Sequence, residues 1–250
     1  MEMIISMQIG EIYETKQGYS VEVIENVKIG YGGRSKVKFL DTYGAIVECS
    51  NAFIYNGTLK NPYHPSVFGI GYLGEHGLGT GINNIKSYKI WKHMLERAYD
   101  PKYHEKFPTY KTVTVCDEWL CYANFEKWFS KNYIEGYHLD KDLLQGDVEN
   151  KVYSPDTCVF LPTFVNSFII NKYSSNTSGI MGVSWNKPSK QWMVTLFDSE
   201  RKVNVNLGRY DSLEYAKEVY LKGRAEKAER IKDRVRELNY LPEHIIQLIK

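Results

Sequence analysis

The spacing of apolar residues changes along the chain, and this change most constrains the fold. Between residues 7 and 60, apolar and polar residues alternate in short stretches separated by glycine-rich turns, a pattern typical of strands. From residue 87 to 99 the apolar residues recur every three or four positions, which predicts an amphipathic helix. A second helix is predicted over 119–133. Because strand and helix patterns occupy separate stretches, the sequence predicts an α+β fold that begins with a small β unit.

The C-terminal stretch carries a third pattern. Strand-like segments at 181–185, 191–197 and 202–207 predict a three-stranded antiparallel sheet. A long helix is predicted from Asp211, capped by that side chain together with Glu214, to about Arg236. Pro242 then predicts a last short helix. The polar residues 173–179 are predicted to be a linker before the sheet.

These patterns predict three domains: a small β-rich domain at 1–75, a central domain at 86–173 and a C-terminal domain at 178–250. Residues 61–81 are rich in glycine and proline and lack periodicity, which indicates a linker or an extended arm.

Charge, hydropathy and cysteine content indicate which partners, cellular compartment and metal to expect. The formal charge is only +2, but residues 178–250 hold 14 Lys and Arg against 10 Asp and Glu, so the C-terminal third is basic. No apolar stretch approaches the roughly 20 residues that cross a bilayer, and the acidic start is unlike a signal peptide, so we expect no membrane association and a cytoplasmic protein. Cys116, Cys121 and Cys158 could hold zinc, but their spacing favours buried thiols and we expect no zinc.

Two short motifs in the C-terminal stretch carry a family resemblance. Gly182-Val183-Ser184-Trp185, followed by Leu207-Gly208-Arg209-Tyr210-Asp211, resembles the Apetala and ethylene-response-factor DNA-binding domain, which also occurs in phage proteins and homing nucleases. The resemblance covers roughly residues 178–225. It implies that the helix lies behind the sheet while the open sheet face enters the major groove of double-stranded DNA.

By position, the resemblance gives the DNA-contacting candidates. They are Ser184, Asn186, Lys187, Lys190, Thr195, Asn204 and Asn206, with Arg201 and Lys202 joining the lysines on phosphates. The plant domain has several arginines where this chain has Ser184, Asn186 and Phe197, which argues against high-affinity reading of G·C-rich sites. The alternative is that the outward polar residues are simply solvated.

The central domain carries a second resemblance. Residues 135–142, then 153–162 and Asn166, resemble the ββα-metal hairpin of HNH homing endonucleases. The resemblance implies two strands joined by a loop at 143–151 and a helix that begins near Pro162. It also implies Mg²⁺ or Mn²⁺ held by Asp140 and Asn166, with Thr157 at the place of a structural asparagine. Another register of the same resemblance puts Asp140 itself at the place of the family's histidine and Asp142 at the second acid.

The resemblance does not identify the general base of this centre, because Lys141 stands where the family has histidine. Lys141 could act as the base if its buried neighbours kept it uncharged, or His138 could reach the site from two residues before Asp140. Otherwise the site is inactive and the hairpin only lies on DNA.

The order of hairpin, linker and sheet predicts a metal-dependent HNH-like DNA endonuclease of phage or mobile-element type, acting in the cytoplasm of an infected bacterial host. The alternative is a catalytically inactive DNA-binding or inhibitory phage protein that keeps the scaffold. A third interpretation assigns protein binding to residues 1–80.

Overall fold

The computed structural model describes residues 7–28, 32–74, 82, 85–169, 178–198 and 201–250. It divides into two compact units, Met1–Lys131 with Val152–Ser154, and Asn132–Lys151 with Pro155–Lys250. Each unit contains both helices and strands, which confirms the α+β prediction. None of the helices in the described part of the chain has the length and apolar character needed to cross a membrane.

The predicted N-terminal β unit is confirmed as a four-stranded antiparallel sheet. Its strands β1 (Ile12–Glu14), β2 (Ser20–Lys28), β3 (Arg34–Phe39) and β4 (Ile46–Ser50) pair in chain order. Alternate residues of β2 and β3 point inward, and Val21, Val23, Val37 and Phe39 are fully buried. The short helix α1 (Asn51–Tyr55), capped by Ser50, adds Ile54 to this core.

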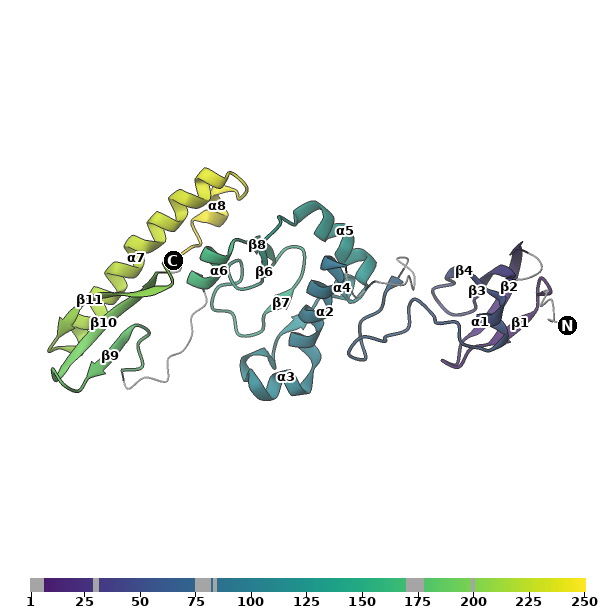
Figure 1. The fold of residues 1–250 in the computed structure, drawn as a ribbon, viewed down its shortest axis with the longest axis horizontal. Coiled ribbons are helices and arrows are strands. Elements are labelled where there is room, and N and C mark those ends of the chain that lie inside the picture. The colour runs from purple at the N-terminus through teal and green to yellow at the C-terminus, as the bar shows by residue number, and fades with distance from the viewer. Residues whose placement is uncertain (1–6, 29–31, 75–81, 83–84, 170–177, 199–200) are drawn as a thin grey trace. The chain divides into compact units, whose positions relative to one another are not determined.

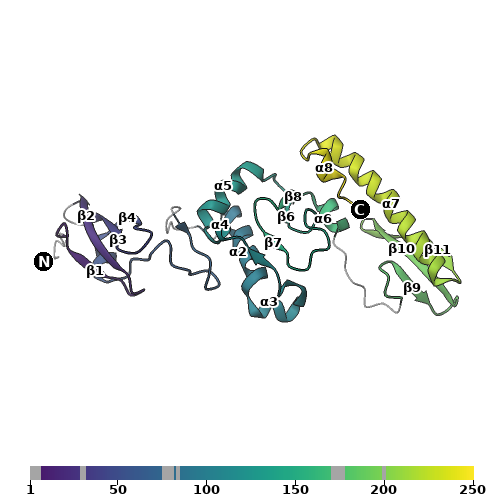
Figure 2. The ribbon, with the colours of Figure 1, turned by 180° about the vertical axis from the view of Figure 1, so that it is seen from behind.

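The first unit also contains several helices. They are α2 (Lys86–Tyr99), α3 (Pro101–Lys106), the 3-10 turn Pro108–Tyr110, α4 (Asp117–Leu120) and α5 (Tyr122–Asn132). Figure 2 shows α2 beside α4 and α5, and the buried Trp91 ring of α2 contacts Tyr122 while its indole N–H donates to the Trp119 carbonyl at 2.7 Å. The helix predicted at 87–99 is confirmed. The second predicted helix is wrong as one piece, because Cys121 has an extended backbone and forms a β-bridge with Tyr72.

The second unit begins with a short hairpin. Strand β6 (His138–Asp140) pairs antiparallel with β8 (Val159–Leu161), and α6 (Thr163–Ile169) follows directly after Pro162. The start of this helix is as predicted, but the connection between the paired strands is longer than the expected loop. Residues Val152–Tyr153, which belong to the first unit, form β7 and pair in parallel with β5 (Thr114–Val115) of that unit.

A three-stranded antiparallel sheet and a long helix form the C-terminal part, as predicted. The strands β9 (Val183–Asn186), β10 (Gln191–Asp198) and β11 (Val203–Tyr210) have the order β11-β10-β9. Helix α7 (Leu213–Leu238) runs along this sheet in both ribbon views (Figures 1 and 2) and buries Ala216 and Tyr220 against Val183 and Val194. The short α8 (Glu243–Ile246) follows, with Pro242 at its N-cap.

The predicted cap of α7 is one residue off. The hydroxyl of Ser212 accepts from the backbone N–H of Tyr215, so Ser212 is the N-cap. The Asp211 carboxylate instead accepts from the Gln191 amide at 3.0 Å, which ties the helix start to strand β10.

The second half of α7 leaves the sheet and packs on the hairpin. The buried cluster there joins α7, α8, α6 and the β6–β8 hairpin, and it contains Leu143, Leu161, Val165, Phe168, Ala228, Ile231, Val235, Ile246 and Ile249. Arginines of α7 cover the aromatic rings of α6, with Arg224 4.4 Å from the Phe168 centroid and Arg234 4.2 Å from that of Phe164. The hairpin and the sheet therefore share one helix.

The three domains predicted from the sequence stay a prediction, and most of the linker predicted at 173–179 lies outside the described residues.

Gly182 tests the packing of α7 on the sheet. Its φ is +75°, and a Cβ there would overlap the Thr195 carbonyl and the Tyr220 ring. Gly182→Ala is expected to lower the free energy of unfolding by roughly 3 kcal/mol or more, combining backbone strain and overpacking. Urea denaturation measures this.

Gly179→Ala is the matched control, because Gly179 also has a positive φ (+66°) but open space around it. It is expected to cost only about 1 kcal/mol. Equal losses in the two variants would contradict the packing described for Gly182.

Candidate metal centre and nucleic-acid interface

Asp140 ends strand β6 and is 4% exposed. Its Oδ1 accepts hydrogen bonds from the backbone N–H groups of Asp142 (2.9 Å) and Leu143 (2.8 Å), so the side chain closes the turn after the strand. Burial, with a smaller effect from the charge of Asp142, raises the pKa of this carboxyl to about 6 against the opposing effects of the N–H donors and Lys141. Asp140 is thus a buried acid that retains its proton unusually well.

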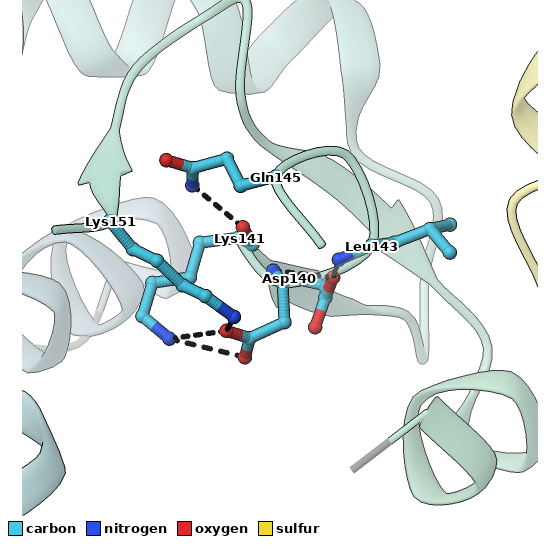
Figure 3. Close-up of polar contacts among 6 residues, drawn as sticks. Asp140, Lys141, Leu143, Gln145 and Lys151 are labelled. Atoms are coloured by element: carbon cyan, nitrogen blue, oxygen red, sulfur yellow. Dashed lines mark hydrogen bonds and ion pairs between the residues drawn. The ribbon is translucent and has the colours of Figure 1, made fainter. Parts of the chain in front are cut away.

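Asp142 lies between two lysines. Lys141 Nζ is 2.9 and 3.1 Å from its two carboxylate oxygens, and Lys151 Nζ is 2.5 Å from Oδ1. Figure 3 shows both lysine chains converging on this carboxylate, while the Gln145 amide donates to the Lys141 carbonyl. Burial alone would raise the pKa of Asp142, but the two ammonium groups outweigh it and the pKa is lowered. The charge of Asp142 is therefore satisfied within the hairpin.

The other predicted centre residues lie nearby but make different contacts. Lys141 is 6% exposed, and its ammonium group is ion-paired with Asp142. His138 is exposed, and its Nε2 is 3.2 Å from the Thr163 hydroxyl at the start of α6. Thr157 lies in the turn at 155–157 before β8, and the half-buried Asn166 lies on α6.

As a set, the proposed ligands do not fit a divalent cation. The Asp142 carboxylate is ion-paired with two lysines, whose charges repel a cation. One carboxylate oxygen of Asp140 already accepts hydrogen bonds from backbone N–H groups. Asp140 and Asn166 lie on β6 and α6, without a hydrogen bond between them among the described residues. The described part of the chain also contains no group of three His, Cys, Asp or Glu side chains that could hold a metal.

The C-terminal sheet has one face without a helix. Residues paired directly across antiparallel strands point to the same side, so the pairs Met193–Ser184, Thr195–Asn206 and Phe197–Asn204 share a face. Val183 and Val194 point the other way, onto α7. We call the side away from α7 the open sheet face; it carries Ser184, Asn186, Gln191, Met193, Thr195, Phe197, Asn204, Asn206 and Arg209.

Every predicted strand residue for DNA contact therefore falls on this one face. The predicted cations lie in the turns at its two ends, with Lys187 and Lys190 between β9 and β10 and Arg201 and Lys202 between β10 and β11. All four are exposed, and only Arg201 has an ion-pair partner within the described residues, Asp198 at 4.0 Å.

The three asparagines of the open sheet face differ in how much of the side chain is available. The Asn186 carbonyl accepts from the backbone and hydroxyl of Ser189, and that of Asn206 accepts from Gly208 N–H at 2.9 Å. Asn204 is exposed and has no side-chain hydrogen bond in the described part of the chain. It is the asparagine best able to offer both its carbonyl and its amide to a base edge.

Arg209 is the residue that the sequence interpretation missed. Strict alternation after Asn204 and Asn206 places residue 208 on the open face, but the pairing shifts between Val194 and Thr195. Arg209 therefore pairs with Met193 and joins this face, where it is exposed. The Leu207-Gly208 pair is the only sequence signal of this bulge, since Gly208 has a φ of +127°.

The chain matches no protein-family model, and comparison with curated proteins and with solved structures gives no significant match. Inferences about function therefore rest on the residues themselves.

The raised pKa of Asp140 predicts how stability depends on pH. The folded-state pKa of about 6 lies above the ordinary value of 3.8, so the folded protein holds this proton more tightly than the unfolded chain. The resulting contribution, about 3 kcal/mol, is present below pH 4 and is lost as the pH rises through 6. Asp140→Asn retains the acceptor for both N–H groups, so above pH 6 it is expected to be more stable than wild type in urea denaturation.

Asp142→Asn is the contrasting variant, because the pKa of Asp142 is lowered by its lysines. It is expected to lose stability at neutral pH and to approach wild type on acidification. A loss of stability in Asp140→Asn above pH 6 would show that the carboxylate charge at Asp140 is compensated.

Proposed function

We propose that this protein binds double-stranded DNA, with the open sheet face as its contact surface. The single observation that carries the proposal is that the register aligns Ser184, Thr195, Asn204, Asn206 and Arg209 on one helix-free face with exposed cations at both ends. A two- or three-stranded β surface fits the width of the major groove.

The chemistry of this face suits base edges and phosphates. An exposed arginine such as Arg209 can donate two hydrogen bonds to guanine, and Asn204 can pair with adenine. Met193 and Phe197 offer apolar contact to thymine methyl groups, and Phe197 is 49% exposed. Lys187, Lys190, Arg201 and Lys202 supply phosphate contacts that hold the register on the duplex. The resemblance to the Apetala type of domain supports the same assignment.

Arg209→Ala tests base reading. A library of duplexes with a randomised centre gives the preferred sequence for the wild-type chain. The variant is expected to bind this sequence about 5- to 100-fold more weakly, corresponding to about 1–3 kcal/mol, and to lose discrimination at one base pair.

Arg230→Ala, an exposed arginine on α7, is the matched control and is expected to retain affinity and preference. If wild type binds no duplex at low salt, the proposed function is wrong. If both variants behave alike, Arg209 does not read a base.

The second candidate is a metal-dependent HNH-like endonuclease acting on the bound DNA, with Mg²⁺ or Mn²⁺. Two observations favour it: the order β6, β8, α6 matches the ββα arrangement, and Asp140 is a buried acid beside that helix. Its difficulty is the pairing of Asp142 with Lys141 and Lys151, which leaves the inactive, DNA-binding form of the scaffold as the better supported interpretation.

Nicking of supercoiled DNA decides between the two. An active centre predicts cleavage with Mg²⁺ or Mn²⁺ that Asp140→Ala and Asn166→Ala abolish. An inactive scaffold predicts salt-sensitive binding without nicking, and Lys141→His is then expected to create cleavage if only the base is missing. The absence of cleavage by both wild type and Lys141→His removes the endonuclease candidate.

A further inference from the structure

Helix α2 has a sharply divided surface. With about 100° per residue, its buried residues Ser87, Tyr88, Trp91, Met94, Leu95 and Ala98 occupy one arc of roughly 120°. The opposite arc carries Lys86, Lys89, Lys92, His93 and Glu96. We call Lys86, Lys89, Lys92 and His93 the α2 basic face.

This face belongs to a basic stretch of the chain. Residues 86–111 contain 7 Lys and Arg against 3 Asp and Glu, a net charge of +4 in 26 residues. The C-terminal residues 178–250 need 73 residues for the same excess. The net positive charge per residue over 86–111 is therefore higher than the average over residues 178–250.

Two lysines of α2 differ in their partners from some of the cations of α7. On α7, Lys232 pairs with Glu229 at 2.8 Å, and Arg236 pairs with Asp233 and Glu243. Lys89 and Lys92 are exposed and have no ion pair within the described residues. They line a shallow hollow with Tyr88, His93 and Glu96. Charges that are unpaired in the free protein lose no partner when they meet phosphates.

The position of the face is fixed by the core beneath it. Trp91 is fully buried, packs on Tyr88 and Tyr122, and is tied to the Trp119 carbonyl. From Lys86 to Lys92 the lysines follow the helix axis for about 9 Å, at 1.5 Å per residue. Duplex DNA carries about one negative charge per 1.7 Å of its axis, so this length can meet several phosphates.

From these observations we propose that the α2 basic face is a second DNA-contact surface, which binds the phosphate backbone of duplex DNA without reading its sequence. The inference rests on the proposed function, and it extends DNA contact from the C-terminal sheet to the other compact unit. Binding then has a sequence-reading part and a purely electrostatic part.

The test compares the full-length Lys89→Gln/Lys92→Gln variant with wild type on a mixed-sequence duplex of about 30 base pairs, between about 50 and 200 mM salt. Loss of two phosphate contacts is expected to reduce the slope of log affinity against log salt by about 2 and to weaken binding roughly 10- to 100-fold near 0.1 M salt. Sequence preference in the randomised library is expected to be unchanged. Thermal melting of each variant checks that the fold is retained.

Lys217→Gln/Lys222→Gln is the matched control, because it removes the same charge from two exposed lysines of α7. It is expected to leave the salt slope nearly unchanged. An equal loss in both double variants would overturn the proposal, since net charge alone would then explain the effect. Tighter binding of a hairpin RNA of equal length through the same lysines would overturn the assignment to DNA.

The two proposals fail in distinguishable ways. If Arg209→Ala weakens binding while Lys89→Gln/Lys92→Gln matches wild type, the second surface is wrong and the sheet interface stands. If wild type binds no duplex, both are wrong.

Discussion

The structure of the second unit depends on one shared apolar helix. The first half of α7 buries Ala216 and Tyr220 on the sheet, and the second half buries Ile231 and Val235 on the hairpin and α6. Neither partner is large enough to bury its own apolar face, since the β6–β8 pair is three residues long and the sheet has three strands. Burial against α7 makes both stable, so the candidate metal centre and the candidate DNA interface sit on a common support.

Electrostatics within the hairpin opposes metal binding at Asp142. A carboxylate that already holds two ammonium groups cannot also hold a metal ion without breaking a partly buried ion-pair cluster, which is costly. Asp140, in turn, serves as the acceptor that closes the turn leading to that cluster. In the structure, the residues that suggest a nuclease in the sequence make hydrogen bonds and ion pairs that stabilise the hairpin.

Most of the helices and strands were predictable from local sequence patterns. Alternation located the N-terminal strands and β9 to β11, and helical spacing located α2 and α7, because these elements bury one regular face each. What the sequence could not show were long-range pairings: the Tyr72–Cys121 bridge that splits α4 from α5, and the β5–β7 pair that lengthens the hairpin connection. On the site, the open-face residues were predictable up to the bulge near Leu207, beyond which Arg209 changed sides. The ion pair between Asp142 and Lys151 could not be predicted from the sequence, because the two residues are nine positions apart.

The continuity of α7 also limits how this protein can exchange parts during evolution. Inserting or deleting a single residue in the middle of the helix would turn its later half by about 100° and move Ile231 and Val235 out of contact with the hairpin. Recombination that replaces the three-stranded sheet must therefore preserve the phase of the helix as well as its length. Only exchanges in register would yield a folded descendant in which α7 still packs on both the sheet and the hairpin.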